Sequence, residues 1–213
     1  MALMVDSALV DEVRRAVALG FVRGCTTNPL LMAKVALSPH KVIEEICKLV
    51  PGPVFYQVTG RTLAEREREG REFHAICPDK MVLKIPATTE NLTLITRLAP
   101  KIPCAVTAIF SGHQTYAAVA AGASWVIPYV NRTTRLLGDG GKLVREMKAV
   151  IKASGSNVRI LAASIKSPEE AAAAVIAGAD DLTLPLDVLS ALGDHRLSAE
   201  ALSEFDRAGA GGA

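Results

Sequence analysis

A lysine within an apolar segment is the residue of this chain best suited to covalent chemistry. Lys84 lies in MVLKIP (81–86), where apolar residues flank it on both sides. A buried ammonium group is unfavourable unless it is paired or loses its proton, and burial lowers the pKa of a lysine. The free amine that results can attack a ketone or aldehyde and form a Schiff base. Two structural alternatives stay open, since Lys84 could extend to solvent or pair with Asp6.

Polar side chains also stand at the ends of most other short apolar segments. Seven of the eight segments end in such residues, which in chain order are Asp6; Thr26, Thr27 and Asn28; Gln57; Lys84; Thr107; Tyr129, Asn131 and Arg132; and Ser164 and Lys166. The eighth segment, DLTLPL (181–186), ends without a comparable group. If the segments are parallel strands of one barrel, their carboxyl ends meet and these residues line a common site.

The residues that follow the seventh segment are typical of an anion site. Ser164 and Lys166 come just before a helix that starts with Pro168. Backbone N–H groups at a helix N-terminus are free to bind an anion, and Arg132 could complete the site. An ordinary capped helix with a nearby surface lysine is the alternative.

The elements that must position these residues follow a regular alternation. Short apolar, β-rich segments cover residues 3–7, 21–29, 53–58, 81–86, 103–110, 125–132, 158–165 and 181–186, and amphipathic or alanine-rich stretches separate them. Eight such units in roughly 200 residues predict a (β/α)₈ TIM barrel, an α/β fold with a parallel sheet. A doubly wound open sheet is the alternative, but it usually carries a Gly-rich loop where this chain has DSALVDE.

Local patterns add detail to this architecture. Period two places Val82 and Lys84 on one face of their strand, so Lys84 points into the central pocket if that face is the barrel interior. Two helix starts are clear: Thr62 and Glu65 have capping-box spacing, and Ser167 and Glu170 stand at the N-cap and third positions of the next clear helix.

No linker or shift in composition divides the chain, so we expect a single barrel domain over residues 1–213. The final stretch, LSAEALSEFDRAGAGGA, predicts a C-terminal helix followed by a flexible Gly/Ala tail over about 206–213.

Composition excludes several classes of protein. Hydrophobic residues make up 50% of the chain and charged residues 22%, which excludes a disordered protein. The net charge of +2, with both signs interspersed, predicts no nucleic-acid partner. No apolar run has the roughly 18 residues of a membrane helix, and the start MALMVDS lacks the basic region of a signal peptide. We therefore expect a soluble cytoplasmic protein with no membrane partner.

The cysteines and histidines predict no metal site. Cys25, Cys47, Cys77 and Cys104 form no CxxC pair and lie among apolar residues, so we expect thiols in the core of a protein from a reducing compartment. The four histidines show no ligand spacing such as HExxH.

The motifs VDS, GCTTNPLL, FYQV, VLKIPAT, CAVTAIF, PYVNR, LAASIK and DLTLPLDVL together resemble the transaldolase family, in its short fructose 6-phosphate aldolase-like branch. The resemblance runs from about Asp6 to Leu189 and follows the same order on all eight predicted strands. It implies a (β/α)₈ barrel whose Schiff-base lysine is on the fourth strand, where Lys84 stands.

The resemblance also implies roles for the other candidates. Lys84 forms the imine and Asp6 transfers protons during carbon–carbon cleavage, while Thr26 and Asn28 line the same side of the substrate. Gln57, Thr107 and Tyr129 hold the water that moves protons during imine formation and hydrolysis. Asn131 and Arg132 face the far end of the substrate, and Arg132, Ser164 and Lys166 hold its phosphate. A protonated imine is itself an electron sink, so neither a metal nor a cofactor is implied.

Two residues distinguish the branches of the family. Transaldolases resemble one another in carrying glutamate at the position of Gln57 and phenylalanine at that of Tyr129, so this chain resembles the aldolases. We therefore expect an aldehyde-lyase, a class I aldolase that cleaves or forms fructose 6-phosphate from dihydroxyacetone, or a similar small ketone, and glyceraldehyde 3-phosphate. There are two alternatives: a transaldolase that transfers dihydroxyacetone between sugar phosphates, and a non-catalytic sugar-phosphate-binding barrel.

The resemblance further implies a homo-oligomer, a pentamer or decamer, in which the C-terminal helix packs on a neighbour.

Overall fold

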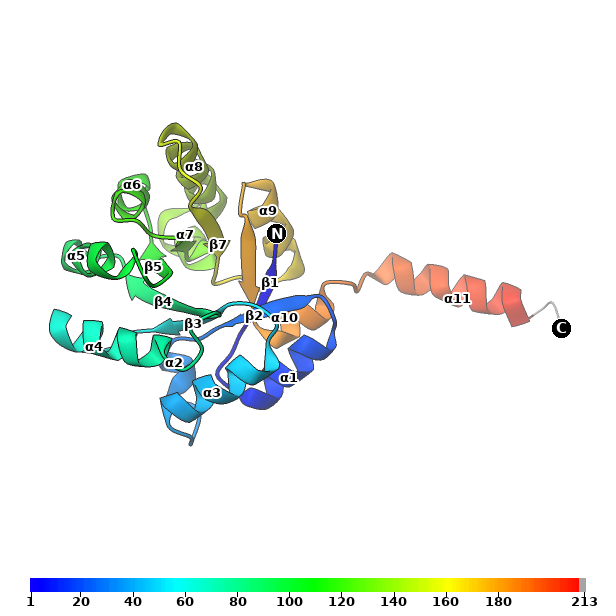
Figure 1. Cartoon of the computed structure of the whole chain (residues 1–213). Coiled ribbons are helices and arrows are strands. Elements are labelled where there is room, and N and C mark those ends of the chain that lie inside the picture. Colours follow the sequence, from blue (N-terminus) through cyan, green and yellow to red (C-terminus); the bar gives the residue numbers. More distant parts are fainter. Residues whose placement is uncertain (211–213) are drawn as a thin grey trace.

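The computed structural model describes residues 1–210 and contains a closed barrel of eight parallel strands. Each strand pairs with the strands that precede and follow it in sequence, and the last strand pairs with the first (Figure 1). The strands are β1 Leu3–Asp6, β2 Val22–Thr26, β3 Val54–Gln57, β4 Met81–Pro86, β5 Cys104–Ile109, β6 Trp125–Pro128, β7 Arg159–Ala162 and β8 Asp181–Leu184. The closed order confirms the predicted (β/α)₈ barrel and excludes the open doubly wound sheet.

Helices surround the barrel on its outside (Figure 1). They are α1 Val10–Ala18, α2 Pro29–Met32, α3 Pro39–Leu49, α4 Leu63–His74, α5 Thr89–Leu98, α6 Gly112–Ala120, α7 Val130–Leu137, α8 Gly140–Ala153, α9 Pro168–Ile176, α10 Leu186–Ala191 and α11 Arg196–Ala210. Residues 1–210 contain no helix that is long and apolar enough to cross a membrane.

The two faces of the strands serve two separate cores. On β4, Leu83 and Ile85 pack outward against the helices, whereas Val82 packs inside the barrel with Phe55 and Leu161. This alternation is the period-two pattern predicted for the segment, and it places Lys84 on the interior face with Val82. Because the apolar interior layer fills the barrel below Lys84, the barrel is a packed core with a site at one end.

A buried carboxylate closes the opposite, amino-terminal end of the barrel. Asp181 is 1% exposed and accepts hydrogen bonds from Arg159 Nε at 2.8 Å and Nη2 at 2.6 Å. It also accepts from the Ala2 N–H at 2.8 Å and from Trp125 Nε1 at 3.2 Å. Burial alone would raise the pKa of Asp181, but these hydrogen bonds outweigh burial and hold that pKa below its usual value.

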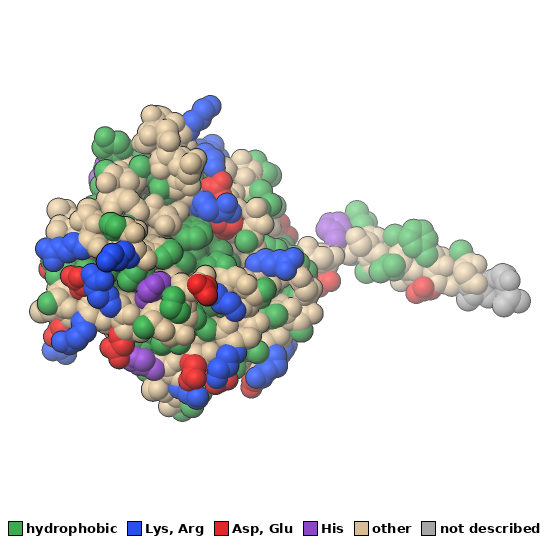
Figure 2. Space-filling view, in the orientation of Figure 1, with side chains coloured by type: hydrophobic (Ala, Val, Ile, Leu, Met, Phe, Trp, Pro, Cys, Tyr) green, Lys and Arg blue, Asp and Glu red, His purple; other side chains and the backbone are tan. Residues whose placement is uncertain are grey.

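The final helix departs from the predicted tail. α11 runs from Arg196 to Ala210, so residues 206–210 are helical where the sequence predicted a flexible tail. The amphipathic pattern that starts the helix continues through Phe205, and one glycine, Gly209, does not end it. Residues 211–213, the remainder of the predicted tail, lie outside the described residues. α11 projects away from the barrel, and hydrophobic side chains gather along it (Figure 2).

The cysteine prediction is wrong for one pair. Cys47, on α3, and Cys77, in the α4–β4 connection, form a disulfide, because the fold brings together two residues that are 30 positions apart. Cys25 and Cys104 are free and buried, as expected. Burial raises the pKa of both thiols, that of Cys104 to about 12, so both stay protonated near neutral pH.

Candidate functional site

A cavity of about 310 Å³ opens at the carboxyl ends of the strands. Its lining residues are Asp6, Asn28, Pro29, Leu30, Gln57, Lys84, Tyr129, Arg132, Ala163, Ser164 and Lys166. Eight of them are residues that the sequence predicted for the site. The parallel strands bring these residues together from six separate segments of the chain, as the barrel prediction requires.

Lys84 occupies the inner end of this cavity. Its side chain projects from β4 into the barrel, and the residue is only 3% exposed. Its Nζ donates a hydrogen bond to the main-chain oxygen of Thr27 at 3.2 Å, and it has no other hydrogen-bond partner among residues 1–210. Lys84 therefore neither reaches solvent nor pairs with Asp6, the two structural explanations that the sequence left open. A buried amine whose partner is a neutral carbonyl is placed to react with an electrophile in the cavity.

A chain of hydroxyl groups holds Asp6 at the end of β1. Thr26 Oγ1 donates to Asp6 Oδ1 at 2.8 Å, and the Thr183 hydroxyl lies 2.6 Å from that of Thr26. Thr26 is 1% exposed and does not line the cavity, so it orients the carboxylate from behind. Sequence reasoning missed Thr183, because it considered the end of the eighth segment and not the threonine within it. Period two places Thr183 on the face opposite Leu182 and Leu184, and that alternation was the available signal.

Three further polar groups come from β3, β5 and the residue after β6: Gln57 and Tyr129 line the cavity, whereas Thr107 is 0% exposed and lies behind the lining. Thr107 Oγ1 donates to the Tyr129 hydroxyl at 3.3 Å, while Gln57 Oε1 is buried and has no hydrogen-bond partner among residues 1–210. Ala108, next to Thr107, has φ 58° at an irregularity in the pairing of β5 with β6. A bulge of this kind redirects the side chains beside it. The hydroxyls and the free amide oxygen are suited to bind a water molecule or a substrate hydroxyl.

The outer part of the cavity is positively charged. The Arg132 guanidinium lies 4.8 Å from the centre of the Tyr129 ring, and Lys166 lines the same cavity. Neither cation forms an ion pair with a carboxylate in the part of the chain that the structure describes. Ser164 lines the same cavity and has φ 60°, an uncommon conformation for a residue with a Cβ. Two unpaired cations and a hydroxyl make this end suitable for an anion.

Asn131 and Arg132 belong to a helix and not to the end of a strand. β6 ends at Pro128, and α7 begins at Val130, so the strand predicted through 132 is too long. Successive residues of a helix are rotated by about 100°, so neighbours cannot share a direction. As a result, Arg132 faces the cavity, whereas the Asn131 side chain donates to Glu170 Oε1 at 2.6 Å. Asn131 therefore does not line the cavity, in contrast to the prediction.

Sequence reasoning also missed the apolar part of the lining. Pro29 and Leu30 follow Asn28 at the start of α2, and Ala163 follows β7. Leu30 is 75% exposed, so it stands at the mouth of the cavity. No feature of the sequence marks an apolar residue at a rim, since exposed single hydrophobic residues are common on protein surfaces.

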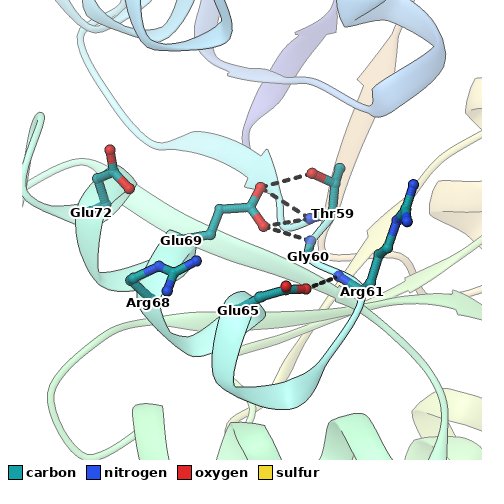
Figure 3. A pocket seen from close by; sticks show the side chains of 7 residues that line it. All are labelled: Thr59, Gly60, Arg61, Glu65, Arg68, Glu69 and Glu72. Carbon is teal, nitrogen blue, oxygen red and sulfur yellow. Dashed lines mark hydrogen bonds between the residues drawn. The ribbon is translucent and has the colours of Figure 1, made fainter.

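A second hollow lies beside the β3–α4 connection, and polar groups that line it form hydrogen bonds with one another (Figure 3). Glu69 of α4 accepts from the Thr59 N–H and hydroxyl and from the Gly60 N–H, at 2.7–3.1 Å. It also accepts from the Tyr56 hydroxyl at 2.7 Å. Because Tyr56 precedes Gln57, this carboxylate fixes the end of β3 from outside the barrel. Within residues 1–210, no group of three or more His, Cys, Asp or Glu residues is placed to hold a metal ion.

Comparisons with known proteins identify similar sequences over nearly the whole chain. Residues 3–210 match the model of a family described as transaldolase/fructose-6-phosphate aldolase. A probable transaldolase of Roseiflexus castenholzii is 39% identical over 207 residues, which are 96% of this chain and 95% of that protein. A probable transaldolase of Thermus thermophilus is 37% identical over 215 residues, covering 96% of each chain.

Solved structures with a similar backbone are more distant in sequence. A mandelate oxidase variant superposes with a TM-score of 0.63 at 15% identity, over 96% of this chain and 70% of that one. At this identity the likeness concerns the barrel fold alone.

Proposed function

The chain belongs to the transaldolase/fructose-6-phosphate aldolase family, and we propose that it is a class I aldolase acting through Lys84. The reaction is cleavage or formation of fructose 6-phosphate, with dihydroxyacetone or a similar small ketone and glyceraldehyde 3-phosphate as the three-carbon partners. The observation that carries the proposal is the Lys84 amine, buried in the cavity with a neutral carbonyl as its partner and with Asp6, Gln57 and Tyr129 in the same lining.

Each step of the reaction has a candidate group. The Lys84 amine attacks the ketone carbon of the substrate, and loss of water gives a protonated imine. Asp6 removes the proton of the hydroxyl on carbon four, the bond between carbons three and four breaks, and its electron pair enters the imine to form an enamine. Glyceraldehyde 3-phosphate leaves at this point. Protonation of the enamine and hydrolysis of the imine then release the ketone and the free lysine.

The water and the phosphate have separate binding groups in this scheme. Gln57, Thr107 and Tyr129 hold the water that carries protons, and the Tyr129 hydroxyl supplies the proton that the enamine takes up. The substrate phosphate lies at the cationic end of the cavity with Arg132, Ser164 and Lys166, where neither cation has a carboxylate partner among residues 1–210. The electron sink is the imine itself, so the scheme uses no metal and no cofactor.

A transaldolase is the second candidate, because the relatives reported above carry that name. It would retain the enamine until an aldehyde acceptor arrives, whereas an aldolase protonates it and releases free dihydroxyacetone. Gln57 and Tyr129 favour release, since the resemblance associates glutamate and phenylalanine at these positions with transfer.

Borohydride trapping tests the proposal. The protein is incubated with fructose 6-phosphate or dihydroxyacetone and reduced, and the adduct is located by intact mass and peptide mapping. We expect one adduct on Lys84, none in Lys84→Met, and, with dihydroxyacetone, which carries no phosphate, an undiminished adduct in the control Lys166→Met. No adduct, or one on Lys166 alone, would contradict the imine mechanism and leave a non-catalytic barrel. Free dihydroxyacetone formed without an acceptor distinguishes aldolase from transaldolase.

A further inference from the structure

The capping glutamate of α9 makes an unusual set of contacts. Glu170 is the third residue of the helix, and its N–H donates to the N-cap Ser167 Oγ at 3.2 Å. In a capping box, the carboxylate of this residue accepts from the N–H of the N-cap residue. Glu170 Oε2 instead accepts from the Lys166 N–H at 2.8 Å, and its Oε1 accepts from the Asn131 side chain of α7 at 2.6 Å.

The helix α4 offers a comparison at the same position. Its third residue, Glu65, accepts from the N–H of the N-cap residue Thr62 at 3.0 Å. It also accepts from the Arg61 N–H at 2.8 Å (Figure 3). Both glutamates therefore bind the N–H of the residue before the N-cap. Only at Glu170 does a side chain from another helix replace the N-cap N–H.

Asn131 completes a closed set of contacts around the cationic end of the cavity. Its backbone N–H donates to the main-chain oxygen of Ser164 at 3.0 Å, while its side chain donates to Glu170. Glu170 in turn holds the Lys166 N–H, so the segment from Ser164 to Lys166 is fixed at both ends. Ser164 keeps its left-handed conformation within this segment, and such a conformation persists only where surrounding contacts enforce it. Arg132 is the neighbour of Asn131 on α7.

From these contacts we propose that Glu170 and Asn131 are positioning residues that hold Arg132, Ser164 and Lys166 in the geometry that binds a phosphate monoester. The proposal rests on the aldolase function above for the identity of that ester, the phosphate end of the sugar substrate. The Glu170 carboxylate binds an amide and a backbone N–H, so it organises the site without pairing with either cation. Arg132 and Lys166 keep their charge available for the anion.

Steady-state kinetics of four variants test this role: Glu170→Gln, Asn131→Ala, the double variant, and the matched control Glu65→Gln. A glutamine has one acceptor oxygen, which the backbone N–H of Lys166 retains, so Glu170→Gln removes the charged acceptor of the Asn131 amide, the same contact that Asn131→Ala removes. We expect each single variant to raise KM for fructose 6-phosphate about tenfold and to change kcat less than about twofold. The increase in KM corresponds to the loss of one hydrogen bond to a charged group. KM for unphosphorylated fructose is expected to stay unchanged, and the double variant to be no worse than either single variant.

The control and a binding measurement separate this role from helix capping and from the proposed function. Glu65→Gln is expected to lower Tm like Glu170→Gln and to leave both KM values unchanged. Equal increases in KM for both substrates, or an increase in Glu65→Gln, would overturn the proposal. Binding of inorganic phosphate by calorimetry gives a second readout, with Kd expected about tenfold higher in Glu170→Gln. If the wild-type protein turns over no sugar phosphate, the aldolase function fails, and an unchanged phosphate Kd would then overturn the positioning role separately.

Discussion

At the scale of single residues, Lys84 shows how the barrel interior accommodates a buried amino group. An amino group that loses its contacts with water needs a hydrogen-bond partner to replace them, and the Thr27 carbonyl supplies one. A carboxylate in that position would stabilise the charged form and hold the amine away from an incoming carbonyl group. The Thr27 hydroxyl donates to the Phe55 carbonyl at 2.9 Å, so the backbone that carries this acceptor is itself fixed.

Removal of the Tyr129 hydroxyl tests, at the level of one residue, whether the protein acts as an aldolase or as a transaldolase. In Tyr129→Phe, we expect release of free dihydroxyacetone without an acceptor to fall at least about tenfold, because the group that protonates the enamine is lost. Borohydride trapping of dihydroxyacetone on Lys84 is expected to persist. The measurement is enzymatic assay of free dihydroxyacetone, with Tyr116→Phe, an exposed tyrosine of α6, as the control. Unchanged release in Tyr129→Phe would remove Tyr129 from the protonation step.

At the scale of elements, β6 and α7 show how a strand end becomes a site. The chain leaves β6 at Pro128 and enters α7 two residues later, and Tyr129 between them bridges to Ala163 of the neighbouring chain segment. This tight turn brings both Tyr129 and Arg132, a residue of the first turn of α7, into the lining of the cavity. The Asn131 side chain instead contacts Glu170 of α9, and this contact connects two neighbouring βα units of the barrel.

A stability prediction at the same scale concerns Asp181, at the amino-terminal end of the barrel. Asp181 joins β8 to β7, β6 and the first residues of the chain, and Asp181→Asn is expected to lower the free energy of unfolding by about 3 kcal/mol at neutral pH. This figure is at the low end for a broken buried pair, because the Arg159 side chain is 43% exposed and partly screened by solvent. Chemical denaturation measures the difference, and Asp11→Asn, at a surface ion pair with Arg14, serves as a control with little expected change.

The same carboxylate gives this difference a defined dependence on pH. The pKa of Asp181 is lower in the folded protein than the value of about 3.9 in an unfolded chain. Its contribution to stability is therefore complete above pH values near 4 and is lost as the pH falls through the folded-state pKa. We expect the stability difference between wild type and Asp181→Asn to shrink below about pH 4. A difference that stays constant down to pH 2 would show that the charge of Asp181 is not its source.

At the scale of the whole molecule, α11 is the element that the barrel does not explain. Leu197, Leu202 and Phe205 are 55%, 61% and 68% exposed, and they lie on one side of a helix that projects from the barrel. A single helix of this length is only marginally stable in water without a packing partner. Together with the resemblance described above, this favours a homo-oligomer in which α11 packs on a neighbouring copy.

Removal of α11 tests the assembly. A chain that ends at His195 is expected to keep the circular dichroism of a folded barrel and to behave as a smaller species by light scattering after size exclusion. Phe205→Asp is expected to act in the same direction, because it places a charge on the apolar side of the helix. Ser203→Asp, which places the charge on the opposite side, is the matched control. A wild-type chain that is already monomeric would contradict the role of α11.

The architecture and most residues of the site could be predicted from local patterns in the sequence. Alternation of apolar strands with helices specifies a barrel, and period two specifies that Lys84 points inward, because both patterns are local and repeat along the chain. Since strand ends meet on one rim, eight of the predicted residues could be assigned to one cavity without knowledge of their distances.

Contacts between individual side chains could not be predicted in this way, because they depend on how the whole chain packs. That Thr26 lies behind Asp6 and beside Thr183 depends on the register of three strands, and no short segment encodes that register. The contact of Asn131 with Glu170 depends on where α7 begins, since a shift of one residue would rotate the amide by about 100° around the helix axis. The Cys47–Cys77 disulfide likewise follows from the approach of α3 to the α4–β4 connection. Such contacts join residues far apart in the chain, and their geometry exists only once all eight units have packed together.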